Sequence, residues 1–223
     1  MLEVIEGAIS RWKAGFDSAR LKRRWNRLKG MGLQIGQGVN LPASTWVDTS
    51  HCYLISIGDW CGFGEQCLIL AHDAQMDEFL DAGLIAKVTI HESCHFGSRT
   101  VILPGVEIGP RTIVGANSVV SKSLPRDTVC AGAPAKVICS LDDYLVRHRQ
   151  SMSQNATFPW TEYNLAALTP EKRQEMLAAV AKGPAYITGG FSEELQGQGG
   201  TERTPYDHTA KPHGMQYLKD RPK

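Results

Sequence analysis

Large apolar residues recur at every sixth position through the middle of the chain. The series runs Ile90, Phe96, Ile102, Ile108, Val114 and Val120, and a small or β-branched residue follows most of them four positions later. A period of six fits neither an α-helix nor an amphipathic strand, but it is typical of a solenoid whose coils are triangles of short strands. We expect the large residues to fill the interior and the small ones to pack near the corners.

Glycine directly follows three of the large apolar positions, at Gly97, Gly109 and Gly115. Because glycine adopts conformations closed to other residues, we expect these three to permit the turn of each coil. Three cysteines, Cys61, Cys67 and Cys94, occupy the small inward position. A compact apolar thiol packs well there, so we expect core packing rather than disulfide or metal chemistry.

The six-residue period begins near Ile35 and continues to residue 138, with two interruptions. The first lies around residues 48–53, and the second is a longer break at residues 71–87 that contains His72 and Asp73. A break of this length inside a regular solenoid is usually functional. The pattern therefore predicts a main domain over residues 35–138 with a loop insertion at 71–87.

Helical spacing precedes this domain. The apolar spacing within residues 2–29 predicts a helix in an N-terminal segment, 1–34, and residues 20–29 give that helix a strongly basic polar face. Two interpretations stay open. In the first, the basic face binds the surface of an anionic membrane as a peripheral contact. In the second, the helix packs on the end of the solenoid as a cap, and its charged side chains are solvated.

Two more helices are expected after the repeats, in an extension over residues 139–188. Ser140 can cap the first, and Thr169 followed by Pro170 is a start signal for the second. Residues 189–223 are rich in Gly, Pro and charge and poor in large apolar residues, which predicts a flexible tail.

Composition narrows the class of protein. The 223 residues carry a formal charge of +1, so no bulk electrostatic attraction to nucleic acid is expected. No apolar run approaches the roughly 18 residues of a membrane span, and the first residues do not look like a secretory signal. We expect a cytoplasmic protein, with the inner face of the membrane as the variant that the basic helix suggests.

Between residues 35 and 138 the chain resembles the left-handed β-helix, hexapeptide-repeat acyltransferases. The likeness is strongest to the maltose/galactoside acetyltransferase-like and bacterial glycan O-acetyltransferase branches. It is carried by Ile69-Leu-Ala-His-Asp73, Ile102-Leu-Pro-Gly-Val-Glu-Ile-Gly109, Gly115-Ala-Asn-Ser-Val-Val-Ser-Lys122 and Gly132-Ala-Pro-Ala-Lys-Val-Ile138. The resemblance implies acetyl-CoA as co-substrate, no metal, homotrimers with active sites between subunits, and a sugar or bacterial polysaccharide precursor as acceptor.

The resemblance also assigns roles to residues. It places the catalytic histidine on His72, as the general base for direct attack of an acceptor hydroxyl on acetyl-CoA, a task that suits the unperturbed pKa of histidine, roughly 6.5. Asp73 could orient an imidazole or shape the loop, and Asp48 is a candidate for contact with a sugar hydroxyl. The implied cofactor-binding residues are Ser98, Ala116, Ser121, Lys122 and Lys136.

Two departures from the family pattern leave the acceptor open. His95 stands where many relatives carry an aromatic residue, and Arg99 stands where several sugar acetyltransferases have histidine. O-acetylation of a sugar is favoured, with N-acetylation of an amino sugar as the alternative, and antibiotic acetylation stays open. Serine acetyltransferase is disfavoured, because residues 1–34 cannot supply the large helical domain of those relatives.

Two interpretations from other classes remain. His72, His91 and His95 could be zinc ligands, as in the γ-type carbonic anhydrases, although the spacing of His91 and His95 differs from that class. The chain could also be a non-catalytic trimeric scaffold. Bound zinc would favour the first of these, whereas thermal stabilisation by CoA would favour the transferase.

Overall fold

The computed structural model describes residues 21–190, and the chain divides into two compact units, Met1–Ile138 and Cys139–Lys223. Residues 21–30 form a helix, which agrees with the end of the helix expected at 2–29. The remainder of that helix, and residues 191–223 of the tail expected at 189–223, lie outside the described residues.

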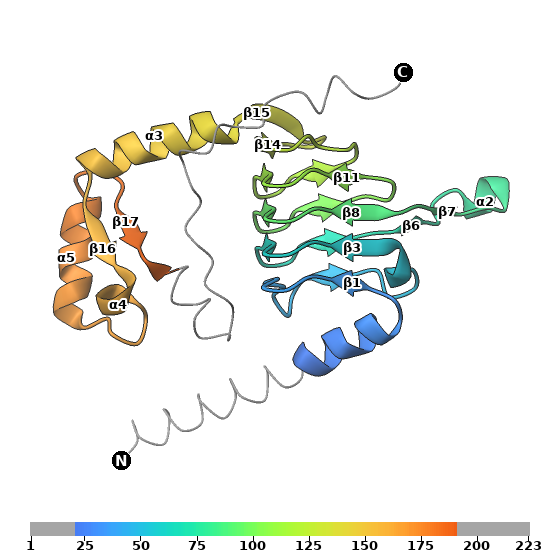
Figure 1. The fold of residues 1–223 in the computed structure, drawn as a ribbon, viewed down its shortest axis with the longest axis horizontal. Coiled ribbons are helices and arrows are strands. Elements are labelled where there is room, and N and C mark those ends of the chain that lie inside the picture. Colours follow the sequence, from blue (N-terminus) through green and yellow to red (C-terminus); the bar gives the residue numbers. More distant parts are fainter. Residues whose placement is uncertain (1–20, 191–223) are drawn as a thin grey trace, which may run out of the picture. The chain divides into compact units, whose positions relative to one another are not determined.

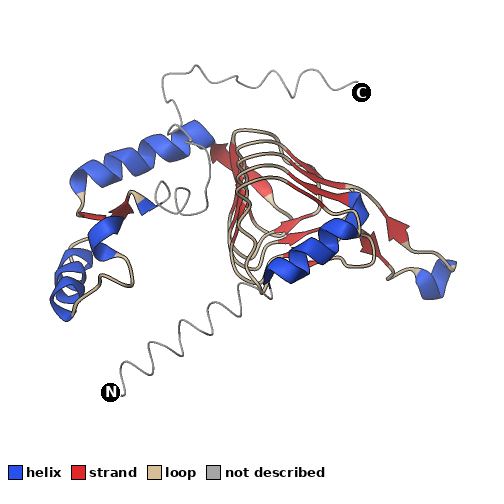
Figure 2. Ribbon diagram, turned by 60° about the horizontal axis from the view of Figure 1, so that its bottom comes forward, coloured by secondary structure: helices blue, strands red, loops and turns tan. Residues whose placement is uncertain are grey.

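The first unit is a β-helix built from three sheets, in which the strands of successive coils pair in parallel (Figures 1 and 2). Successive strands of the chain visit the sheets in turn, so each coil is a triangle of strands that are mostly two residues long. The first sheet contains β1 (Gln34–Ile35), β3 (Ile55–Ile57), β8 (Val88–Ile90) and β11 (Glu107–Ile108). The second contains β2 (Trp46–Val47), β5 (Leu68–Ile69), β10 (Val101–Ile102) and β13 (Val119–Val120). The third contains β4 (Gly62–Phe63), β9 (His95–Phe96), β12 (Ile113–Val114), β14 (Thr128–Ala131) and β15 (Lys136–Ser140). The predicted hexapeptide-repeat β-helix with helices before and after it is confirmed.

The interior is filled as the six-residue period predicts. Ile90, Ile102, Ile108, Val114 and Val120 are each at most 1% exposed. The three cysteines at the small inward position are buried as well, as expected. Threonine and serine can share this position because their hydroxyls donate to carbonyls of the corners, which satisfies their hydrogen bonding without water. These bonds are Thr100 Oγ1 to Gly97 O (2.7 Å), Thr112 Oγ1 to Pro125 O (2.8 Å) and Ser118 Oγ to Gly115 O (2.6 Å).

The role expected for the corner glycines is wrong. Gly97 does not have a positive φ; the left-handed conformation falls two residues later, on Arg99. Close approach between coils explains the glycine instead, because a Cβ on Gly97 would lie 2.3 Å from the backbone nitrogen of Ala116. The side chain is absent so that neighbouring coils can hydrogen-bond at their normal spacing.

The insertion at residues 71–87 is not a plain loop. It is a hairpin in which β6 (His72–Asp73) pairs antiparallel with β7 (Leu84–Ile85), with the short helix α2 (Asp77–Leu80) at the tip. Figure 1 shows it as an arm that leaves the side of the coil stack. We call residues 71–87 the arm. The backbone N–H of Ala86 donates to the carbonyl of Ala71 (2.9 Å), which closes the arm at its base.

The second unit begins with α3 (Leu141–Gln154), and the side chain of Ser140 caps it by accepting the N–H of Asp143 (3.0 Å), as predicted. The second predicted helix is α5 (Pro170–Val180), capped by Thr169. Between them, β16 (Thr157–Pro159) leads into α4 (Trp160–Tyr163), and β17 (Tyr186–Thr188) pairs parallel with β16. No helix within residues 21–190 is both long and apolar enough to cross a bilayer.

Candidate active site

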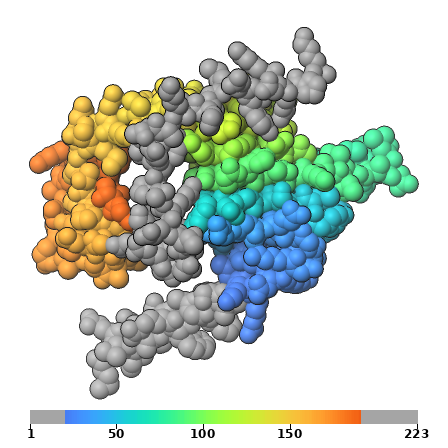
Figure 3. Space-filling view, in the orientation of Figure 1, coloured from blue at the N-terminus to red at the C-terminus, as the bar shows by residue number. Residues whose placement is uncertain are grey.

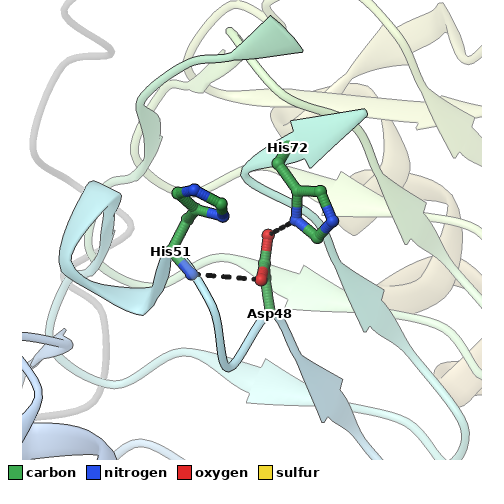
Figure 4. A group of neighbouring side chains, drawn as sticks. All are labelled: Asp48, His51 and His72. Atoms are coloured by element: carbon green, nitrogen blue, oxygen red, sulfur yellow. Dashed lines mark hydrogen bonds and ion pairs between the residues drawn. The ribbon is translucent and has the colours of Figure 1, made fainter. Parts of the chain in front are cut away.

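His72 stands where the chain leaves the coil stack to enter the arm (Figure 3 shows the arm projecting from the stack). It is the first residue of β6 and closely follows β5. Its Nδ1 is hydrogen-bonded to Oδ2 of Asp48 (Figure 4), and its side chain is 33% exposed. One ring nitrogen is therefore fixed by the protein, and Nε2 is the nitrogen left for proton transfer.

Asp48 belongs to the preceding coil and is completely buried. It follows β2, which pairs with β5, and this register places its carboxylate beside the base of the arm. Its Oδ2 accepts the N–H of Ala71 (3.1 Å) in addition to His72. Its Oδ1 accepts the N–H groups of Ser50 (3.0 Å) and His51 (3.2 Å). A buried charge is stable only when it is paired and hydrogen-bonded, and here both oxygens are engaged twice.

These hydrogen bonds set the charge of the carboxyl group. Burial alone would raise the pKa of Asp48, but the bonds from His72, Ala71 and His51 outweigh it and hold that pKa below its usual value. The carboxylate is thus ionised at neutral pH and can only accept, so Nδ1 of His72 carries the proton of this bond. In the neutral ring Nε2 then presents a lone pair, the form that a general base requires.

His51 is the third ionisable group of the site. It directly precedes the 3-10 helix η1 (Cys52–Leu54), and its ring centroid lies 4.9 Å from that of His72 at an interplanar angle of 43°. Among the described residues, Asp48, His51 and His72 form the group that could hold a metal ion, with one ligand atom each and all within 4.8 Å of one another. Each oxygen of Asp48 already takes part in two hydrogen bonds, so an ion bound there would have to compete with these bonds for the carboxylate. The arrangement favours proton transfer over metal binding.

The zinc set of His72, His91 and His95 is not assembled within the described part of the chain. Nε2 of His91 pairs with Oε1 of Glu107 at 2.9 Å. His95 lies on β9 in the third sheet with an exposed side chain. The group of metal-ligating side chains that residues 21–190 do form contains neither of them.

The two predicted aspartates have different roles in the structure, which for Asp73 agrees with the second of the two alternatives, shaping of the loop. Both oxygens of Asp48 are occupied by protein donors, so the carboxylate positions His72 rather than facing an acceptor. Oδ1 of Asp73 accepts the N–H of Gln75 (2.9 Å), so Asp73 shapes the arm and does not orient the imidazole. Neither the pairing of Asp48 with His72 nor a role for His51 is predicted from the sequence. A signal exists in the alignment of the coils, because Val47 and Ile69 are each the third large apolar residue of a run of six-residue repeats, and their strands pair.

The predicted cofactor residues fall at two corners of the coil. Ser98 and Ala116 are not buried and follow the third sheet, where the N–H of Asn117 donates to the carbonyl of Ser98 (2.9 Å). Ser121 and Lys122 are exposed after β13, a strand of the same sheet as β5, and so lie at the corner from which His72 emerges. Lys136 is exposed at the start of β15.

Comparison with known proteins agrees with this architecture. The family model for the bacterial transferase hexapeptide (six repeats) matches residues 87–122. WcaF of Escherichia coli K12, provisionally named a colanic acid biosynthesis acetyltransferase, is 29% identical over 156 residues, which cover 60% of this chain and 82% of WcaF. The galactoside O-acetyltransferase of Escherichia coli K12 is 43% identical over 56 residues, which cover 25% of this chain and 28% of that protein. A solved galactoside acetyltransferase in complex with coenzyme A aligns with a TM-score of 0.44 at 21% identity, over 56% of this chain and 72% of that one.

Proposed function

We propose that the chain is an acetyltransferase of the hexapeptide-repeat transferase family and that it moves the acetyl group of acetyl-CoA to a hydroxyl of a sugar or bacterial polysaccharide precursor. The observation that carries the proposal is the hydrogen bond between Nδ1 of His72 and the carboxylate of Asp48. A buried, ionised Asp48 holds one nitrogen of a partly exposed imidazole, at the place where the arm leaves the coils.

The reaction needs one base and no covalent intermediate on the protein. Nε2 of His72 takes the proton of the acceptor hydroxyl while the oxygen attacks the thioester carbonyl. The carbon–sulfur bond then breaks, and the imidazolium returns the proton to the departing CoA thiolate. Asp48 contributes throughout, because a fixed negative charge at Nδ1 stabilises the imidazolium and keeps the ring oriented.

Acetyl-CoA is proposed to lie along the accessible residues at the coil corners. Backbone N–H groups near Ser98 and Ala116 are fixed before the reaction and suit a developing oxyanion and the pantetheine amides. Ser121 and Lys122, at the corner of His72, are proposed to line the groove from the side of the histidine, and Lys136 supplies a point charge for the nucleotide phosphates.

The two-corner arrangement supports a site shared between copies of the chain. Ser98 and Ala116 follow the third sheet, whereas His72 follows the second, so a side of the triangle separates them. We propose a homotrimer in which the imidazole of one protomer faces the cofactor groove of the next. The acceptor then enters between two solenoids.

Release of CoA thiol in the presence of acetyl-CoA and a panel of methyl glycosides and amino sugars tests the reaction. The proposal expects thiol release with at least one hydroxyl acceptor, and loss of about 10²-fold or more of that rate in His72→Ala. Unchanged melting temperature and oligomeric state would show that the variant is folded. An unchanged rate in such a variant would exclude His72 as the base, and faster acetylation of amines would favour N-acetylation.

A further inference from the structure

His51 belongs to the site but has no task in the proton transfer assigned to His72. Its ring faces that of His72 across a centroid distance of 4.9 Å (Figure 4). The ring of Tyr53 also lies near it, at 5.9 Å between centroids. The fold thus holds a second imidazole beside the proposed base.

One carboxylate sets the places of both rings. Oδ1 of Asp48 accepts the backbone N–H of His51, and Oδ2 of the same group is bonded to Nδ1 of His72. The turn that carries His51 and the base of the arm that carries His72 are therefore fixed relative to each other by a buried residue. Such fixed pairs of polar groups suit recognition of two polar atoms of one ligand.

The Nδ1 atom of His51 is buried and has no hydrogen-bond partner among the described residues. A buried polar atom without a partner is destabilising, and a ligand group that hydrogen-bonds to it removes this cost. Each nitrogen of a neutral imidazole either accepts or donates one hydrogen bond. A hydroxyl group can be the partner in both cases, because it can donate as well as accept.

The spacing of the two rings limits which hydroxyls can be bound. One nitrogen of each ring lies within 4.8 Å of the other. Oxygens on adjacent carbons of a sugar ring are separated by about the length of a hydrogen bond, roughly 3 Å. With ring centroids 4.9 Å apart, the two imidazoles lie close enough for one acceptor with two neighbouring hydroxyls to contact both.

We propose that His51 binds a second hydroxyl of the acceptor, adjacent to the one that His72 deprotonates, and that the enzyme selects sugars with neighbouring free hydroxyls. This inference rests on the proposed function. His51 binds the acceptor and does not act as a base. A divalent metal ion held by Asp48, His51 and His72 is the competing occupant of the same place.

Deoxy acceptors test the proposal. The probes are the methyl glycosides of galactose, glucose and mannose and, for whichever is acetylated fastest, each monodeoxy analogue. His51→Phe keeps a ring beside His72 but has no nitrogen, and His51→Gln restores a hydrogen-bonding group. His148→Gln, at an exposed histidine of α3, is the matched control.

The wild type should lose about 10- to 100-fold in kcat/KM on the analogue that lacks the hydroxyl next to the acetylated one. His51→Phe should show a similar fall in kcat/KM on the parent glycoside. Its kcat/KM values for the parent glycoside and for the deoxy analogue should then differ by less than about 3-fold. His51→Gln should keep part of the discrimination, and the control all of it. CoA should raise the melting temperature of every variant equally, since none changes the proposed cofactor groove.

Undiminished discrimination in His51→Phe would overturn this inference while the acetyltransferase stands. Stoichiometric zinc in the purified wild type, lost in His51→Phe, would overturn it in favour of a metal site. If the wild type releases no CoA with any acceptor, the proposed function fails and the inference fails with it.

Discussion

Asp48 and His72 are 24 positions apart in sequence, yet they form one hydrogen-bonded pair at the base of the arm because their coils are stacked in register. Val47 pairs with Ile69, and the chain leaves both strands at the same corner. The carboxylate on one coil therefore meets the imidazole on the next without any special loop. Several experiments can examine what this pair does.

Asp48→Asn keeps the size of the side chain but removes its charge. The amide can no longer stabilise an imidazolium, and its NH₂ group competes with the N–H donors that now point at the carboxylate. We expect kcat to fall by about 10²-fold or more, with a smaller change in KM for acetyl-CoA. Steady-state kinetics with varied acetyl-CoA measure this. A fall confined to KM would mean that Asp48 serves cofactor binding instead.

Acid pH should destabilise the first unit through Asp48. Its folded-state pKa lies below the unfolded value, which is about 3.9, so its stabilisation is complete above that value. The contribution is lost as pH falls from about 4 through the lower folded-state pKa. Urea unfolding between pH 3 and pH 7 should show a decline in the wild type that is shallower in Asp48→Asn. Parallel curves for the two proteins would show that other groups cause the acid sensitivity.

Mixed trimers can locate the two halves of the proposed site. His72→Ala removes the base, and Ala116→Trp fills the proposed cofactor groove, so each homotrimer should be inactive. When the two variants are co-expressed in equal amounts, about a quarter of shared sites receive an intact half from each chain. Activity should therefore return to roughly that fraction. No recovery in verified mixed trimers would place the whole site within one protomer.

Gly97→Ala should destabilise the solenoid by about 1–3 kcal/mol, because the new methyl group would lie 2.3 Å from the backbone nitrogen of Ala116. The neighbouring coils must separate to admit it. Gly30→Ala is the control, since a Cβ there meets no atom within 4 Å. Thermal unfolding followed by circular dichroism compares the two. Equal melting temperatures would show that the coils adjust freely.

Much of the fold could be predicted because the six-residue period repeats over many coils. The interior series, the small inward positions and the caps at Ser140 and Thr169 follow from local chemistry. The corner glycines were misinterpreted, because the close approach between Gly97 and Ala116 depends on how two separate coils stack and not on the local turn.

The candidate site was harder to predict for a related reason. His72 could be singled out by its position at a break in the period, but its partner is set by strand register across a coil. Asp73 follows His72 directly in sequence and would be the obvious partner for its imidazole. Its Oδ1 instead accepts the backbone N–H of Gln75. His51 lies in an interruption of the repeat, where the period carries no information about which residues meet.

The arm also bears on how such proteins diverge. It begins and ends at one corner, and the hydrogen bond from Ala86 to Ala71 seals its base before β8 resumes the next coil. An arm of another length or composition can replace residues 73–85 while the coils before and after it keep their strand register. The segment next to His72 can thus vary in sequence and length without altering the coils that hold Asp48 in place.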